Sequence, residues 1–141
     1  MADRTANATW NGDLFEGGGT VSASSSGLFT DAAITWASRT EDAGGRTSPE
    51  ELMAAAHAAC FSMALSNELS SRGQAPDRLQ VEATASFEDG KITTMVLDVN
   101  AQVPGVDEEG FREALSAAED SCPVSNALRG NVEIKVTGTL A

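Results

Sequence analysis

Residues 48–73 read SPEELMAAAHAACFSMALSNELSSRG, and they carry the clearest secondary-structure pattern in the chain. Ser48 is placed to cap a helix, Pro49 suits its first turn, and Glu51 completes a capping box with Ser48. Good helix formers continue up to Gly73, which is a natural C-terminal stop. The pattern predicts one helix of about 24 residues, which is ~36 Å long.

The middle of this helix is apolar around most of its circumference, which indicates burial on all sides. The chain has 141 residues, only 5% of them aromatic, so large side chains contribute little to its core. A small domain rarely surrounds so long a helix by itself. We therefore expect a partner chain to cover part of it.

Short strands and a loop are expected ahead of the helix. We predict strands at residues 6–10 and 19–25, a second strand pair within residues 28–36, and a loop with two arginines over residues 38–47. We found no internal repeat and no linker, so a single domain over residues 1–141 is expected.

Behind the helix the pattern changes to alternation. Residues 79–88 alternate apolar and polar side chains, Asp89-Gly90 is a hairpin signal, and a second alternating strand follows. Asp107 is placed to cap a helix over about 108–120, a short helix follows Cys122-Pro123 and stops at Gly130, and a strand ends the chain. One-sided alternation is typical of antiparallel sheets with a solvated face, and the element order predicts an α+β fold.

Composition excludes several classes of partner. The formal net charge is −12, from 21 acidic and nine basic residues, and a field of that sign repels nucleic-acid backbones and anionic membrane surfaces. The N-terminus lacks a signal-peptide pattern, and the uncharged run at residues 52–67 is too short to span a bilayer. We expect a cytoplasmic protein with no nucleic-acid or membrane partner, in which the cysteines form no permanent disulfide.

The two cysteines differ in their predicted settings. Cys60 lies in the middle of the long helix, where burial raises a thiol pKa and the helix dipole gives no help, so a reactive Cys60 needs a cation from elsewhere. Cys122 precedes Pro123 at a predicted helix start, where the thiolate is favoured. Position alone therefore names Cys122 as the more reactive thiol, and it leaves open whether the two are structural or a redox pair.

His57, the only histidine, lies three residues before Cys60 on the same helix face. It suits a base for that thiol or a zinc ligand with Cys60 and Cys122, but the zinc site lacks a clear fourth ligand. A neutral core histidine whose hydrogen-bonding groups are satisfied is the favoured interpretation. No phosphate-binding or dinucleotide-binding loop and no hydrolase triad is found, so we expect no cofactor and no metal.

Two motifs resemble the OsmC/Ohr family, the osmotically inducible and organic-hydroperoxide-resistance proteins. SPEELMAAAHAACFSMALS (48–66) is similar to the central helix of that family, and SCPVSNAL (121–128) is similar to its second cysteine motif. ATWNGDLFEGGGTVS (8–22) and VPGVD (103–107) look like the OsmC branch. The resemblance covers essentially the whole chain. It implies antiparallel sheets packed around long central helices in an intertwined homodimer.

The resemblance also implies a thiol peroxidase and assigns its residues. Cys60 matches the peroxidatic cysteine and Cys122 the resolving cysteine. Arg39, ahead of the helix, matches the arginine that activates the thiol, and Glu50 matches the glutamate that holds this arginine. Arg46 is the alternative to Arg39.

The expected reaction is the reduction of organic hydroperoxides, and of hydrogen peroxide, through a Cys60 sulfenic acid and a Cys60–Cys122 disulfide. An external dithiol, by resemblance a lipoylated protein, then reduces the disulfide. Met53, Phe61 and Met63 could line an apolar pocket or belong to the core. The alternatives are a non-catalytic stress or binding protein with inert thiols, and a His/Cys metal site.

One expectation follows from helix geometry alone. Glu50 and Cys60 are ten residues apart, which corresponds to ~15 Å along a straight helix and ~80° around it. One arginine cannot easily reach both side chains in that arrangement. We therefore expect Arg39 and Glu50 of one chain to meet Cys60 of the other.

Overall fold

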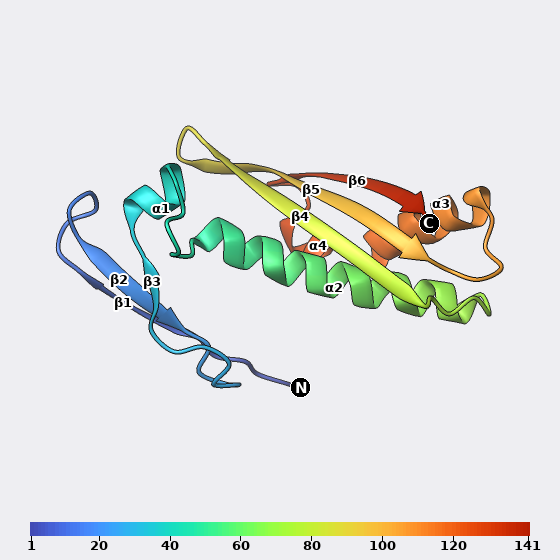
Figure 1. Cartoon of the computed structure of the whole chain (residues 1–141), viewed down its shortest axis with the longest axis horizontal. Helices are drawn as coiled ribbons and strands as arrows, with labels where there is room; N and C mark the ends of the chain where they lie inside the picture. The colour runs from blue at the N-terminus through green and yellow to red at the C-terminus, as the bar shows by residue number, and fades with distance from the viewer. The chain divides into compact units, whose positions relative to one another are not determined.

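The computed structural model describes residues 1–141 and divides the chain into two units, Met1–Leu52 and Met53–Ala141 (Figure 1). Each unit is described by itself below. The single domain expected from the sequence stays a prediction.

The first unit holds a three-stranded antiparallel sheet in the order β1-β2-β3. Its strands are β1 (Asn7–Asn11), β2 (Gly18–Ser22) and β3 (Ala32–Ile34). The first two strands lie close to their predicted positions, residues 6–10 and 19–25. The second strand pair expected within residues 28–36 is wrong, because β3 alone forms there and pairs with β2. Asp31 has a positive φ of 55°, which ends the extended path just before β3.

Helix α1 (Trp36–Thr40) replaces most of the first half of the predicted loop over residues 38–47. Thr35 caps it, because the Thr35 hydroxyl accepts from the Ser38 N–H and the Ser38 hydroxyl accepts from the Thr35 N–H, each over 3.0 Å. A Thr-x-x-Ser box is a weaker sequence signal than one that ends in Glu or Gln. Arg39 therefore lies on the last turn of a short helix and not in a loop.

Helix α2 (Pro49–Ser71) is the long helix that the sequence predicts. The Ser48 hydroxyl accepts from the Glu51 N–H over 3.2 Å, which confirms the cap. The Glu51 carboxylate accepts from the Thr47 hydroxyl over 2.6 Å, so the return half of the capping box is replaced by a different bond. Gly73 ends the helix with a φ of 76°, a conformation that costs glycine little.

The second unit holds most of α2 and a sheet in the order β4-β5-β6. β4 (Arg78–Glu88) and β5 (Lys91–Gln102) form the predicted hairpin. Asp89 and Gly90 both have positive φ, at 51° and 76°, as a two-residue type I′ turn requires.

The expectation of purely antiparallel sheets is wrong for the second unit. β6 (Glu133–Leu140) runs parallel to β5. The connection between them contains two helices, α3 (Glu108–Ser121) and α4 (Pro123–Leu128). These helices return the chain to the starting end of β5, so the next strand has the same direction as β5. Asp107 caps α3 as predicted, accepting from the Gly110 N–H over 2.7 Å.

The core of the second unit lies between this sheet and the helices α2, α3 and α4 (Figure 1). Apolar side chains alternate inward along the three strands as predicted, up to the register shift between Ser86 and Phe87 in β4. Residues of α2, β5, α3 and the turn after α3 are fully or almost fully buried: Phe61, Leu65, Leu69, Met95, Leu97, Val99, Ala101, Phe111, Ala114, Ala118 and Cys122. The sheet's other face carries polar side chains and is solvated, which confirms the α+β class with one wet sheet face.

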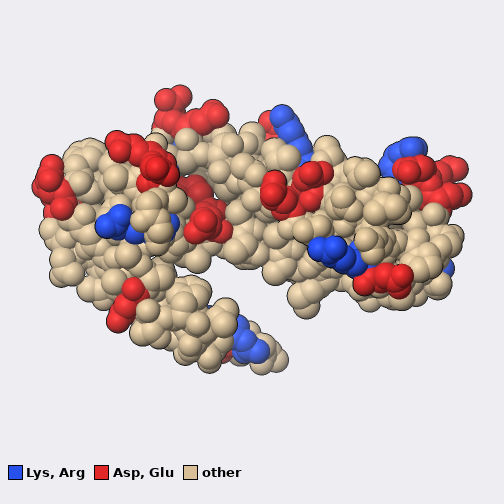
Figure 2. Space-filling model, in the orientation of Figure 1, with Lys and Arg blue, Asp and Glu red and all other residues tan.

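Acidic side chains predominate over basic ones on the face shown in Figure 2, in keeping with the net charge of −12. They are spread over the surface and do not form one block. None of the helices combines the length and the apolar character needed to cross a membrane.

Candidate active site

The second unit brings the two cysteines together. Cys60 projects from the middle of α2, and Cys122 ends α3 and caps α4, with Pro123 at the first position of α4. Both are free thiols; Cys122 is completely buried and Cys60 partly so. The two thiols lie close enough for each to shift the pKa of the other. Two residues distant in the sequence thus form one pair of neighbouring sulfurs.

The surroundings of the two thiols shift their pKa values in opposite directions, upward for Cys60 and downward for Cys122. Burial raises the pKa of Cys60; the Val124 N–H lowers it in part, while the hydrogen bond and charge of Cys122 raise it further. Burial alone would also raise the pKa of Cys122, but hydrogen bonds from the Ser125 hydroxyl, the backbone N–H groups of Ser125 and Val124, and Cys60 lower it on balance. When the pair holds one proton, that proton therefore resides on Cys60. This agrees with the sequence argument that the position of Cys122 favours its thiolate.

His57 contacts neither sulfur through a hydrogen bond. Its Nε2 lies 2.7 Å from the hydroxyl oxygen of Ser125, and both side chains are completely buried. Burial lowers the pKa of His57, so the imidazole is neutral at neutral pH. The interpretation of His57 as a core histidine is confirmed by its burial and its bond to Ser125, but the ring is not fully satisfied, because its Nδ1 is buried without a hydrogen-bond partner. His57, Cys60 and Cys122 do not form a group that could hold a metal ion, so the proposed zinc site is wrong.

Ser125 is a site residue that the sequence reasoning missed. It lies three residues after Cys122 in SCPVSNAL, on the first turn of α4. Residues three apart on a helical turn share a face, and this spacing could have indicated that its hydroxyl approaches the Cys122 sulfur. Its bond to His57 joins residues 68 positions apart, which no local pattern reveals.

The first unit brings Arg39 and Glu50 together. Arg39 Nε donates to Glu50 Oε1 over 2.8 Å, and the Glu50 side chain is almost fully buried. The guanidinium of Arg39 also lies 5.8 Å from the ring centroid of Trp36. The second carboxylate oxygen of Glu50 is buried and has no hydrogen-bond partner. The pair is thus held rigidly at the point where α1 and α2 are joined.

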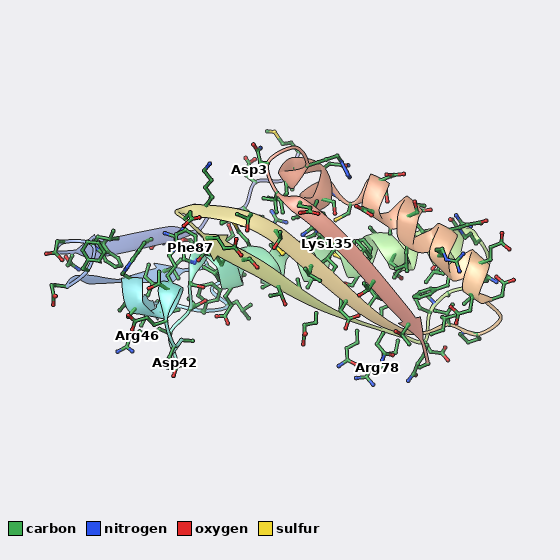
Figure 3. All side chains as sticks on the ribbon, turned by 90° about the horizontal axis from the view of Figure 1, so that it is seen from above. Asp3, Asp42, Arg46, Arg78, Phe87 and Lys135 are labelled. Atoms are coloured by element: carbon green, nitrogen blue, oxygen red, sulfur yellow. The ribbon has the colours of Figure 1, made fainter.

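Arg46, the alternative to Arg39, is exposed and forms no ion pair with an acidic side chain. Figure 3 shows Arg46 and Asp42 extending outward from the segment after α1. The first unit therefore distinguishes the two arginines, since only Arg39 is held by a buried carboxylate.

A cavity of about 450 Å³ opens beside Arg39 in the first unit. Its lining is mostly apolar and comes from β1, the turn after it, and the segment from β3 to the start of α2: Trp10, Gly12, Leu14, Ile34, Thr35, Trp36, Arg39 and Pro49. Such a lining suits a small apolar molecule that carries one polar group. By contrast, Phe61 belongs to the core, and Met63 is 73% exposed on α2.

Comparison with known proteins places the chain in a family. The family model described as OsmC-like protein matches residues 41–137. Peroxiredoxin OsmC of Escherichia coli (strain K12) is 37% identical over 135 residues, which cover 93% of each chain. The chain belongs to the OsmC-like family. This confirms the resemblance drawn from its two cysteine motifs.

The family also includes proteins named for hydroperoxide resistance. The organic hydroperoxide resistance protein of Xanthomonas axonopodis pv. citri is 33% identical over 141 residues, covering 94% of this chain and 92% of its own. The crystal structure of OhrB from Bacillus subtilis superposes with a TM-score of 0.69 at 30% identity, over 96% of this chain and 98% of that one. An OsmC-like protein from Mycoplasma pneumoniae has a TM-score of 0.75 at 17% identity, covering 99% and 98%, and shows the same fold.

The match by sequence includes Glu50, Cys60 and Cys122, and Arg39 lies two residues before it. The structural match extends over nearly the whole chain, both units included. This chain and OhrB of Bacillus subtilis thus share one fold over nearly their whole lengths.

Proposed function

We propose that the protein is a cysteine-based peroxidase that reduces organic hydroperoxides, and hydrogen peroxide as a smaller substrate. The observation that carries this proposal is the pair of neighbouring free thiols, Cys60 and Cys122, at the edge of the apolar core. Relatives named peroxiredoxin and organic hydroperoxide resistance protein support it.

In the first step the Cys60 thiolate attacks one peroxide oxygen. An S–O bond forms and the O–O bond breaks, so sulfur is oxidised to the sulfenic acid and the peroxide is reduced. The leaving alkoxide takes up a proton and departs as an alcohol, or as water when the substrate is hydrogen peroxide.

In the second step the Cys122 thiolate attacks the sulfur of the Cys60 sulfenic acid. An S–S bond forms, the S–O bond breaks, and the leaving hydroxide takes up a proton as water. An external dithiol then reduces the disulfide by exchange, and we propose a lipoylated protein for this role.

Cys60 needs a positive charge to act as the attacking thiolate, because burial and its neighbour Cys122 both raise its pKa. We assign this role to Arg39, with Glu50 holding the guanidinium. A guanidinium stabilises a thiolate and the peroxide oxygens through charge-assisted hydrogen bonds. The apolar cavity beside Arg39 supports binding of the organic part of a hydroperoxide next to that charge.

We further propose that the active form is an intertwined homodimer. Ala55, Ala56, Ala59 and Met63 are exposed on one side of α2, so the middle of this helix presents an apolar face. A second copy of the chain that packs there would bury it, as the composition of the helix predicts. Ten residues separate Glu50 from Cys60 on α2, a rise of ~15 Å. This separation supports a site in which Arg39 and Glu50 of one chain serve Cys60 of the other.

A thiol titration tests the proposed function. Denatured protein should show two reactive thiols before treatment and none after one equivalent of cumene hydroperoxide, because a redox pair loses both thiols together. The alternative, a non-catalytic stress or binding protein with inert thiols, predicts two thiols before and after. A turnover assay with dihydrolipoamide and with thioredoxin as reductants then tests the lipoylated partner, for which dihydrolipoamide should be the faster.

A further inference from the structure

A buried chain of three side chains connects α2 to the second thiol. His57 Nε2 lies 2.7 Å from Ser125 Oγ, and Ser125, three residues after Cys122, lowers the pKa of the Cys122 thiol through its hydroxyl. All three side chains are completely buried. Burying polar groups is costly unless they bind one another, so this set belongs to the site and not to general packing.

The direction of these hydrogen bonds follows from the chemistry of their ends. A thiolate only accepts, so the Ser125 hydroxyl donates its single hydrogen to Cys122. The Ser125 oxygen then accepts from His57, which places the imidazole hydrogen on Nε2. Nδ1 of His57 is buried without a partner and remains the bare ring nitrogen. The resulting chain, Nε2–H to Oγ–H to sulfur, has every donor aimed at Cys122.

We propose that His57 and Ser125 are positioning residues that hold Cys122 as the thiolate that attacks the Cys60 sulfenic acid. This inference rests on the proposed peroxidase function and extends it to the second step. The resting hydrogen bond between the two sulfurs needs the Cys60 thiol hydrogen, which is absent once Cys60 is oxidised. The Ser125 hydroxyl takes no part in that bond change, so it is available to donate to Cys122 at the moment of attack.

The groups that act on the Cys122 sulfur come from two elements. α2 supplies Cys60 directly and His57 through Ser125, while α4 supplies the Ser125 hydroxyl and the backbone N–H groups of Val124 and Ser125. None of these groups carries a formal positive charge. Hydrogen bonds thus stabilise the Cys122 thiolate, whereas a guanidinium is proposed to stabilise the Cys60 thiolate.

The first experiment measures the ionisation of Cys122 without any peroxide. In a Cys60→Ala background Cys122 is the only thiol, and its ultraviolet thiolate absorbance is followed against pH. Ser125→Ala should raise the pKa of Cys122 by about one unit or more, a tenfold change in its ionisation constant. Ser121→Ala, one residue before Cys122 with its hydroxyl on the Ala118 carbonyl, is the matched control and should leave the titration unchanged.

The role of His57 is tested by a pair of variants. His57→Gln retains an amide N–H that can donate to Ser125, whereas His57→Leu fills the space without a donor. We expect His57→Leu to raise the pKa of Cys122 and His57→Gln to keep it within a few tenths of a unit of the background. If Ser125→Ala fails to fold, the His57→Gln and His57→Leu variants still test the inference. Their side chains have roughly similar volumes, so a difference in the pKa of Cys122 between them reports the loss of the donor and not a change in packing.

The second experiment separates the two chemical steps in otherwise unsubstituted protein. Single-turnover peroxide loss reports the first step, and the lifetime of trapped sulfenic acid reports the second. Ser125→Ala should lower the ratio of the second rate to the first at least tenfold, and Ser121→Ala should not.

An unchanged Cys122 titration in Ser125→Ala, or equal effects of His57→Gln and His57→Leu, overturns the inference, since packing alone would then explain these residues. Absence of peroxide consumption by the unsubstituted protein would defeat the proposed peroxidase function instead. The titration in the Cys60→Ala background uses no peroxide, so the two failures are distinguishable.

Discussion

Arg39 Nε donates to Glu50 Oε1 over 2.8 Å, and this bond joins the last turn of α1 to the first turn of α2. The Glu50 side chain is almost fully buried, so its carboxylate keeps the arginine from adopting the many rotamers of an exposed side chain. Glu50 also lies in the first turn of α2, where the helix dipole favours a negative charge. The guanidinium of Arg39 is therefore held in place by a buried carboxylate, unlike a charge in a solvated surface ion pair.

Arg39→Ala should slow the reaction of Cys60 with peroxide by at least ~10-fold, the effect of losing one charge-assisted hydrogen bond of about 1.4 kcal/mol or more. The pKa of Cys60 should rise in parallel. Stopped-flow peroxide consumption measures the rate. Arg46→Ala is the matched control, since it removes an equal charge from an exposed position, and it should change the rate little. A larger effect for Arg46→Ala would transfer the activating role to that residue.

Cys60→Ser should abolish peroxide consumption, while Cys122→Ser should consume one equivalent and stop as the sulfenic acid. Within the second unit the pKa of Cys122 is lowered and that of Cys60 is raised. These shifts alone would favour Cys122 as the attacking thiolate, so the experiment tests the assignment directly. Mass spectrometry after trapping the sulfenic acid identifies the oxidised residue. Single-turnover rates that are equal in Cys60→Ser and the parent protein would reverse the roles of the two thiols.

The sequence predicts those parts of the fold whose causes are local. Ser48 and Gly73 bound α2 because capping depends on a few adjacent residues, and Asp89-Gly90 sets the β4–β5 hairpin for the same reason. The inward positions of β4 and β5 follow from alternation alone.

What the sequence leaves undetermined depends on contacts between distant residues. β6 is parallel to β5 because of the path of two helices, which alternation within β6 does not record. The bond between His57 and Ser125 and the contact between Cys60 and Cys122 likewise arise from tertiary packing. The chemical contrast between the cysteines was nevertheless predictable, since it depends on one being mid-helix and the other at a helix start.

Mixing the inactive Cys60→Ser variant with the slowed Arg39→Ala variant should restore activity if the site is shared between chains. In a Cys60→Ser and Arg39→Ala heterodimer, one of the two sites combines an intact Cys60 with an intact Arg39 from the other chain. We expect about half the activity of the parent dimer per heterodimer, measured after subunit exchange under mild denaturant. Homodimers of either variant, exchanged in the same way, are the controls. A mixture no more active than the Arg39→Ala homodimer would mean that each chain completes its own site.

Stability should depend on pH through His57, which is the only histidine and completely buried. Burial lowers its pKa below the usual 6.5, so the neutral imidazole is favoured in the folded state. Above about pH 7 neither state binds the proton, and His57 contributes no pH dependence. Below about pH 6.5 the unfolded chain binds a proton that the folded chain does not, so the free energy of unfolding falls as the pH falls, by up to about 1.4 kcal/mol per pH unit. The loss ends once the pH drops below the folded-state pKa.

His57→Gln removes this contribution and leaves every carboxylate in place, so the difference between the two proteins isolates it. Urea unfolding of parent and His57→Gln, at one protein concentration because a dimer's stability depends on concentration, should give curves of stability against pH that are parallel above about pH 7. Below about pH 6 the parent should lose stability faster than the variant. Curves that stay parallel down to about pH 5 would mean that the imidazole takes up its proton in the folded core. In that case His57 would be a cation beside Ser125. The hydrogen-bond chain from His57 through Ser125 to Cys122 would then begin at an imidazolium and not at a neutral imidazole.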